Sequence, residues 1–125
     1  MKINNKKIGL NFVRGPLIPK KIYYIFGLDE NFINKPFSFY NYLCILSAKK
    51  VNPTYEITVF YKYPSQSIYF KKLESFCTLI QIDENSPLTP QQHSSLDKID
   101  FAHYEHLGDL MRLYLLYNYG GIYLD

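Results

Sequence analysis

The sequence predicts an α/β domain with a largely parallel sheet, and three observations support this fold class. Short β-branched and aromatic runs alternate with helical segments, which is the order expected of βαβ units with right-handed crossovers. Stretches rich in Pro, Gly and Ser separate these runs. The chain has 125 residues, of which 47% are hydrophobic and 20% charged, the balance of a globular domain that can bury a core.

The first half of the chain predicts a strand, a helix and a second strand. Lys20–Gly27 is a β-branched and aromatic run, so it predicts a buried strand. Leu28–Phe37 is a polar stretch and predicts a loop. A helix is expected to begin at about Ser38 and to end by Asn52, because a proline follows and disfavours helix at the residue before it. Tyr55–Tyr63 predicts the second strand.

The next segment adds a short helix and a third strand. A proline breaks the second strand, and Ser65–Phe76 predicts a short helix with Ser65 or Ser67 as its N-cap. Cys77–Asp83 then predicts the third strand. Glu84–Lys98 is rich in Pro, Ser and Gln and predicts a loop.

The chain closes with a helix and a fourth strand. The helix is expected from about Phe101 or Tyr104 to about Tyr119, with Gly120 as a left-handed C-cap. Ile122–Asp125 predicts the last strand. Because leucine and tyrosine occur on nearly every side of the helix, we expect it to be buried all around.

Charge and composition exclude several classes of function. The formal net charge is +3, and the lysines that produce it are scattered, so nucleic acid is not expected as a partner. Two cysteines are too few for a disulfide framework or a zinc site. No apolar run approaches the roughly 20 residues of a membrane helix, and no secretory signal is evident. We therefore expect no membrane segment and a cytoplasmic location.

Four polar residues near the end of the chain form a candidate site. Asp109 and Arg112 are three residues apart on the last helix, so they are neighbours on one face and can pair. Tyr123 and Asp125 share one face of the last strand. If that face turns toward the helix pair, all four meet at the carboxyl end of a strand, where ligands of parallel sheets bind. The structural alternative is an ion pair that ties the helix to a loop.

Two stretches of sequence resemble a known family. "GDLMRLYLLYNYGGIYLD" closes the chain and is similar to the sugar-binding region of DXD-containing glycosyltransferases, the group that includes the initiating yeast mannosyltransferases and the large clostridial glucosylating toxins. "IPKKIYYIFG" resembles the opening strand of that family. The resemblance implies a Rossmann-like sheet, the N-terminal half of a GT-A type domain. Residues 1–17 would be an N-terminal extension and residues 18–125 the nucleotide-sugar-binding domain, incomplete at its C-terminus.

The resemblance also implies roles for individual residues. Asp109 and Arg112 would hold hydroxyl groups of the donor sugar, and Tyr123 would contact the sugar or phosphate region. Phe26 stands where the family has an aromatic residue that stacks on the nucleotide base. Ile25, beside it, belongs to the same donor-binding set.

The final residue, Asp125, matches the first aspartate of the DXD pair, which positions Mg²⁺ or Mn²⁺ on the diphosphate. The sequence stops there, so one aspartate would hold the metal less firmly. The function implied is metal-dependent and retaining transfer of a hexose from a UDP- or GDP-linked sugar to a glycan or protein acceptor. Two alternatives stay open: a non-catalytic nucleotide-sugar-binding remnant and a structural interaction module.

Overall fold

The computed structural model describes residues 17–33, 37–83 and 104–125, and it confirms the predicted fold class. Four strands form one sheet in the order β3-β2-β1-β4, and every neighbouring pair is parallel. The chain therefore moves outward from β1 through β2 to β3 and returns to the other side of β1 for β4. The strands are β1 (Lys21–Phe26), β2 (Glu56–Tyr61), β3 (Thr78–Gln81) and β4 (Ile122–Tyr123).

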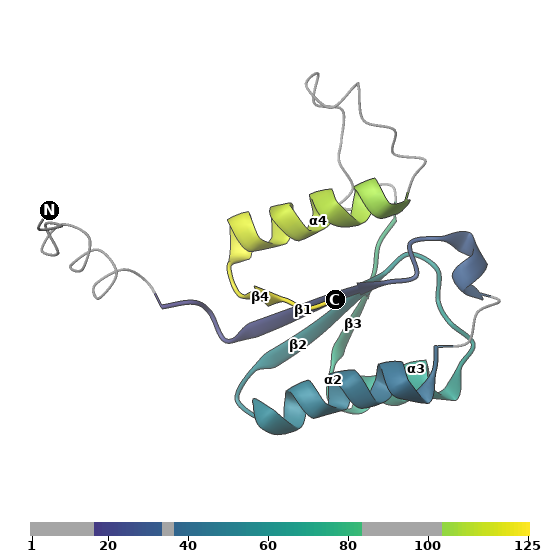
Figure 1. The fold of residues 1–125 in the computed structure, drawn as a ribbon, viewed down its shortest axis with the longest axis horizontal. Helices are drawn as coiled ribbons and strands as arrows, with labels where there is room; N and C mark the ends of the chain where they lie inside the picture. The colour runs from purple at the N-terminus through teal and green to yellow at the C-terminus, as the bar shows by residue number, and fades with distance from the viewer. Residues whose placement is uncertain (1–16, 34–36, 84–103) are drawn as a thin grey trace, which may run out of the picture.

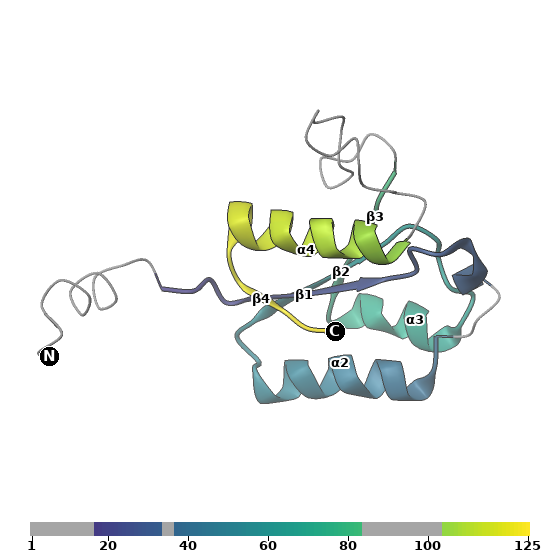
Figure 2. The ribbon, with the colours of Figure 1, turned by 45° about the horizontal axis from the view of Figure 1, so that its top comes forward.

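Helices cover both faces of this sheet. Figures 1 and 2 show α2 and α3 on one face and α4 alone on the other. Two short 3-10 helices, η1 and η2, connect strands to helices. The helical elements are η1 (Glu30–Ile33), α2 (Phe39–Val51), α3 (Ile68–Lys72), η2 (Leu73–Ser75) and α4 (Tyr104–Tyr119).

Serine side chains begin the helices on the α2–α3 face. The Ser38 hydroxyl accepts a hydrogen bond from the Asn41 amide, and the Asn41 side chain accepts one from the Ser38 amide, which completes a capping box. Ser67 is the N-cap of α3, as one of the two predicted alternatives. The other serine, Ser65, accepts hydrogen bonds from the amides of Ser67 and Phe37, so it joins the start of α3 to the chain that enters α2.

The core on the α2–α3 face is apolar and rich in aromatic rings. Phe37 and Phe70 meet edge to face with ring centroids 5.4 Å apart, which is a favourable geometry for aromatic pairs. The strands contribute alternate residues to this core, because successive side chains of a strand point to opposite faces of the sheet. The buried members of this core are Ile22, Tyr24, Phe37, Ile45, Ile57, Val59, Phe70 and Leu73.

The core under α4 is smaller, and the prediction of a helix buried on nearly all sides is wrong. Met111 and Leu115, one helical turn apart, are fully buried against the sheet. Tyr117, by contrast, is 90% exposed and Leu113 is 64% exposed. The physical reason is that α4 packs on the described sheet through a single stripe, so the outward leucine and tyrosine face solvent.

Two segments differ from their predicted boundaries. The predicted loop Leu28–Phe37 contains η1, which Asp29 starts by accepting hydrogen bonds from the backbone and side chain of Asn31. The predicted last strand pairs over Ile122–Tyr123, and the ladder with β1 ends with a hydrogen bond from the Leu124 amide to the Tyr23 carbonyl. The predicted loop Glu84–Lys98 and residues 1–16 lie outside the described residues.

Candidate functional site

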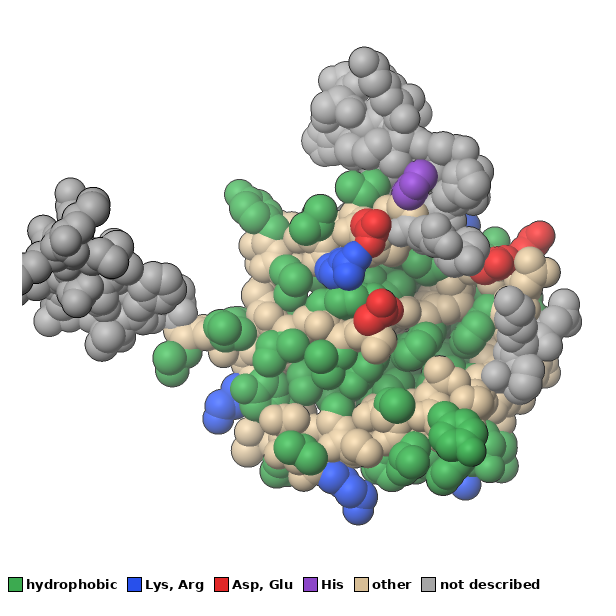
Figure 3. All heavy atoms as spheres, in the orientation of Figure 1, with side chains coloured by type: hydrophobic (Ala, Val, Ile, Leu, Met, Phe, Trp, Pro, Cys, Tyr) green, Lys and Arg blue, Asp and Glu red, His purple; other side chains and the backbone are tan. Residues whose placement is uncertain are grey.

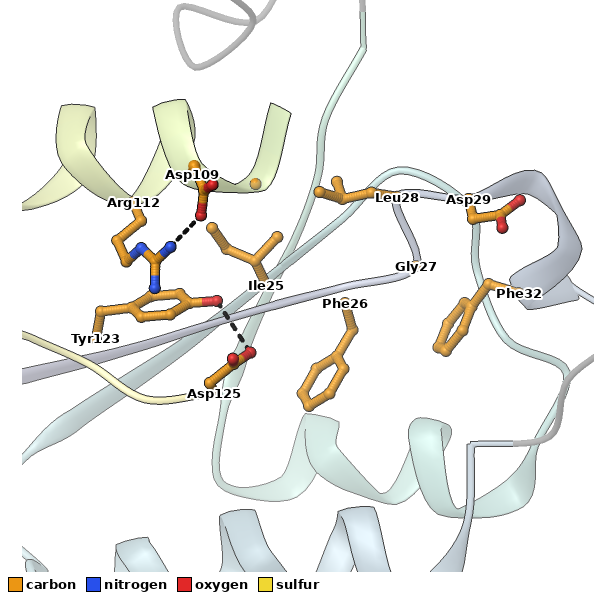
Figure 4. Close-up of a pocket in the computed structure, with 11 residues that line it drawn as sticks. Ile25, Phe26, Gly27, Leu28, Asp29, Phe32, Asp109, Arg112, Tyr123 and Asp125 are labelled. Carbon is orange, nitrogen blue, oxygen red and sulfur yellow. Dashed lines mark hydrogen bonds and ion pairs between the residues drawn. The ribbon is translucent and has the colours of Figure 1, made fainter. Parts of the chain in front are cut away.

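A cavity of about 420 Å³ lies at the carboxyl ends of β1 and β4. In this strand order, β1 is where the chain changes direction across the sheet, and such a switch point opens a crevice for ligands. Figure 4 shows the lining residues reaching the cavity from β1, α4 and the end of the chain. They are Ile25, Phe26, Gly27, Leu28, Asp29, Phe32, Gly108, Asp109, Arg112, Tyr123 and Asp125.

The wall formed by β1 depends on a sharp turn at Gly27. Its φ of +63° is in the left-handed region, and an added Cβ would lie 2.6 Å from the Tyr63 carbonyl oxygen and 2.5 Å from the Phe32 ring. The Gly27 carbonyl accepts hydrogen bonds from the amides of Lys62 and Tyr63, which tie the turn to the chain beyond β2. This close packing fixes Leu28 and Phe32 at the cavity.

The helix α4 supplies an ion pair. The Arg112 guanidinium donates a hydrogen bond to Asp109 Oδ1, so the two residues pair as their spacing predicts. The side chain of Asp109 is 63% exposed and that of Arg112 39% exposed, so the pair is open to solvent. An exposed pair of this kind contributes on the order of 0–1 kcal/mol to stability. Its position in the wall of the cavity leaves both groups accessible to a ligand.

A pair of glycines brings the last strand beside this helix. Gly120 (φ +65°) and Gly121 (φ +105°) follow α4, and the Gly120 amide donates to the Leu116 carbonyl, which confirms the predicted C-cap. The pair reverses the chain within two residues. Tyr123 is then placed opposite Tyr23 of β1, on the α4 side of the sheet.

Tyr123 links the ion pair to Asp125. The Arg112 guanidinium carbon lies 5.0 Å from the centroid of the Tyr123 ring, within the range of a cation–π interaction. The Tyr123 hydroxyl donates a long hydrogen bond of 3.5 Å to Asp125 Oδ1. Burial raises the pKa of Tyr123 above its usual value, the negative charge of Asp125 raises it further, and Arg112 opposes the rise. The phenol is therefore a neutral donor across the physiological pH range.

A divalent cation fits the chemistry of this end of the cavity. Asp125 offers an exposed carboxylate, whereas the carboxylate of Asp109 is held by Arg112. Hard cations such as Mg²⁺ are bound in proteins by one or two carboxylates together with substrate phosphates and water. The described residues contain no group of three or more His, Cys, Asp or Glu side chains arranged to hold a metal by themselves. Asp125 therefore fits as one ligand of a metal that a diphosphate also binds.

The structure brings all the predicted site residues to one cavity, although they approach it from different sides of the sheet. Ile25 packs with the core under α4, the helix that carries Asp109 and Arg112. Phe26 packs with the opposite core, with its ring edge to face with Phe37 at 5.4 Å. The cavity thus wraps around the end of β1 (Figure 4).

Sequence reasoning missed part of the β1 side of the cavity. Phe32 lines it from η1, and Leu28 and Gly27 line it from the turn before η1. The sequence of Leu28–Phe37 predicts a polar loop. The two phenylalanines within it, Phe32 and Phe37, were the signal that part of this stretch packs against the domain. On the surface of the molecule, acidic and basic side chains gather beside α4 over a largely apolar area (Figure 3).

Comparisons with known proteins give one match. Residues 38–125 match the family described as glycosyltransferase sugar-binding region containing DXD motif. The matched region runs from the N-cap of α2 to Asp125, so it contains the α4 ion pair and the last strand, whereas β1 precedes it. No curated protein and no solved structure matches the chain. Within the described part of the chain, no helix has the length and apolar character needed to cross a membrane.

Proposed function

Because the chain belongs to the family of glycosyltransferase sugar-binding regions that contain a DXD motif, we propose that it binds a nucleotide sugar and takes part in hexose transfer. The donor is UDP- or GDP-linked, the acceptor is a glycan or a protein, and the anomeric configuration is retained, as the resemblance implies. The observation that supports this proposal best is the meeting of Asp109, Arg112 and Tyr123 with Asp125 in one cavity at the switch point of the sheet.

The polar end of the cavity suits a sugar joined to phosphate. The Asp109 carboxylate accepts hydrogen bonds from sugar hydroxyl groups, and Arg112 donates to hydroxyl or phosphate oxygens from its planar guanidinium. Tyr123 supplies a neutral hydroxyl between them and Asp125. Because Asp109 and Arg112 already hold each other, the donor meets a pair whose geometry is set before binding.

The metal requirement is part of the proposal. DXD-motif glycosyltransferases generally bind a divalent metal ion. A bound Mg²⁺ or Mn²⁺ neutralises negative charge that builds up on a departing nucleoside diphosphate. In this chain Asp125 would hold it by one carboxylate, beside the phenol of Tyr123. We also place the chain in the cytoplasm, where the two free cysteines, Cys44 and Cys77, stay reduced.

A second candidate function is donor binding without catalysis. It is favoured by the few carboxylates that the described cavity offers to a metal outside the Arg112 pair. These are Asp125 and Asp29, and Asp29 Oδ1 already accepts hydrogen bonds from Asn31. This function needs the same polar end of the cavity and differs only in turnover. The two candidates are therefore separable by an assay that measures binding and chemistry on the same sample.

The experiment combines calorimetry with an assay of donor hydrolysis. UDP-glucose and GDP-mannose are titrated into the full chain with and without Mn²⁺, and release of the nucleoside diphosphate is then measured. Metal-dependent release supports transfer, and binding without release supports the non-catalytic alternative. Failure of both donors to bind in the presence of Mn²⁺ would overturn both. Asp109→Asn tests the cavity, with Glu56→Gln as a matched loss of an exposed carboxylate outside it.

A further inference from the structure

A second candidate site lies on the opposite face of the sheet, along α3 and η2. Two adjoining hollows of about 590 Å³ and 600 Å³ share Lys71 and Glu74 in their walls. The first hollow extends toward the end of β2 and is also lined by Ser65, Gln66 and Tyr61. The second extends over η2. Together they form a trough rather than a closed pocket.

This trough is separate from the donor cavity. None of the residues that line either hollow also lines the cavity at the ends of β1 and β4. Figures 1 and 2 place α3 beside α2, with the sheet between it and α4. A ligand in the trough and a donor at the ion pair of α4 would therefore bind at the same time.

One tyrosine lines each hollow, Tyr61 the first and Tyr42 the second. Tyr42 lines the second hollow, and its ring lies 6.0 Å from the rings of both Tyr69 and Phe76. Phe39 lies outside both hollows, 5.5 Å from Tyr69, and is 47% exposed at the first turn of α2. Tyr40 beside it is 77% exposed. Tyr42 and Tyr61 are half-buried against the core of this face, so each presents part of its ring to the trough.

The polar side of the trough carries donors and acceptors of both signs. Lys71 and Lys72 offer ammonium donors, and Glu74 offers a carboxylate acceptor. Gln66 can donate and accept. This mixture is a poor match for a polyanion, because the acid would repel it. It suits a chain of hydroxyl groups, each of which donates and accepts.

We propose that the trough along α3 and η2 binds a linear oligosaccharide. A pyranose ring has an apolar face of C–H groups, which packs on the ring of Tyr42 in one hollow and on that of Tyr61 in the other. Its edge of hydroxyl groups bonds to Lys71 and Glu74, which both hollows share. Two adjoining hollows take consecutive sugar units. The site goes beyond the proposed donor function, since it requires neither a nucleotide nor a metal.

The test uses maltohexaose, cellohexaose, mannohexaose and xylohexaose as probes of the full chain. Each is titrated to about 10 mM, the range of weak binding, while backbone amide shifts are recorded by NMR. We expect one probe to shift the amides of residues 65–75 without added metal. The double variant Lys71→Met with Glu74→Gln should weaken that binding by about tenfold or more. Lys50→Met with Glu56→Gln removes the same charges outside both hollows and should leave it unchanged.

Two results would overturn the oligosaccharide site. One is the absence of shifts with all four probes, and the other is equal binding to the chain and to the double variant. Failure of the donor proposal is distinguishable, because it appears as a lack of UDP-glucose and GDP-mannose binding in a chain that still responds to an oligosaccharide. Asp109→Asn should leave the oligosaccharide affinity unchanged, since Asp109 lines the donor cavity and neither of the two hollows.

Discussion

The two faces of the sheet are built for different purposes. On the α2–α3 face, Phe37 and Phe70 join aliphatic residues in a core without charged members, so this face supplies most of the apolar burial. On the α4 face, burial is concentrated at Met111 and Leu115. The same helix carries an exposed ion pair one turn away at the cavity. The comparison teaches that stability and ligand chemistry are separated by the sheet, so they should respond to different substitutions.

The largest expected effect is a loss of stability after a substitution in the core of the α2–α3 face. Phe37→Ala removes a ring that is 2% exposed and should lower the free energy of unfolding by about 3–5 kcal/mol. Tyr117→Ala on the outer side of α4 removes a ring that is 90% exposed and should change it by about 0.5 kcal/mol or less. Urea denaturation followed by circular dichroism measures both. Similar losses for the two variants would contradict the division between the faces.

The next effect tests the turn between the two faces. Gly27→Ala forces a side chain into a left-handed φ and toward the Tyr63 carbonyl, and should cost about 1–3 kcal/mol of stability. Gly108→Ala is the matched control, because the added Cβ would lie 3.4 Å from Leu28 in ordinary contact. In a helix it should leave stability unchanged or raise it by up to about 1 kcal/mol. Equal melting temperatures for both variants would remove the case for strain at Gly27.

The third effect concerns ligand binding with little loss of stability. Arg112→Lys keeps the charge but loses the planar fork, and Asp109→Asn removes an acceptor charge. Each should weaken nucleotide-sugar affinity by about tenfold or more, yet change stability by less than about 1 kcal/mol, because the pair is exposed. Calorimetry and denaturation on the same preparations measure the two quantities. Unfolding of either variant without a defined binding defect would instead favour the structural ion pair.

A smaller effect distinguishes the two cysteines. Burial raises the pKa of the Cys77 thiol to about 12, whereas Cys44 is exposed on α2. The thiolate is the reactive form, so iodoacetamide at pH 8 should modify Cys44 well before Cys77. Peptide mapping by mass spectrometry over time gives the order, and urea should abolish the difference. Simultaneous modification in the native protein would show that Cys77 is not protected by this core.

The same thiol also makes stability depend on alkaline pH. Folding raises the Cys77 pKa from 9.0 to about 12, so its contribution to stability is complete below about pH 9 and is lost as the pH rises toward 12. Cys77→Ala should therefore make the decline of stability over that range shallower. Denaturation series for both proteins at matched ionic strength provide the measurement, and parallel declines would contradict it.

The fold was predictable where sequence patterns are local. The β-branched runs predicted β1, β2 and β3, and a serine cap predicted the start of α3, because such signals act through neighbouring residues. The exposure of α4 was not predictable from its own residues. It depends on how much of the helix the sheet covers, and Leu113 and Tyr117 lie beyond that contact. Composition shows which side chains are apolar, and only packing shows which are buried.

The candidate site was also predictable where its signals are local and not predictable where packing decides. Asp109 with Arg112, and Tyr123 with Asp125, were each predicted from periodicity within one element. Their convergence required the strand order, which sets β4 beside β1. Phe32 was not predicted as a site residue because η1 is too short to give a sequence pattern. Its place at the cavity is fixed by the turn at Gly27.

The glycine pair after α4 sets which face of the last strand turns toward the cavity. The number of residues between Arg112 and Asp125 therefore becomes a feature by which related sequences can be compared. Successive residues of a strand point to opposite faces, so one residue inserted after Gly121 would turn Ile122 and Leu124 toward the cavity in place of Tyr123 and Asp125. Relatives that keep this spacing keep a carboxylate at the rim. Those that change it by an odd number lose the carboxylate there even if every residue type is retained.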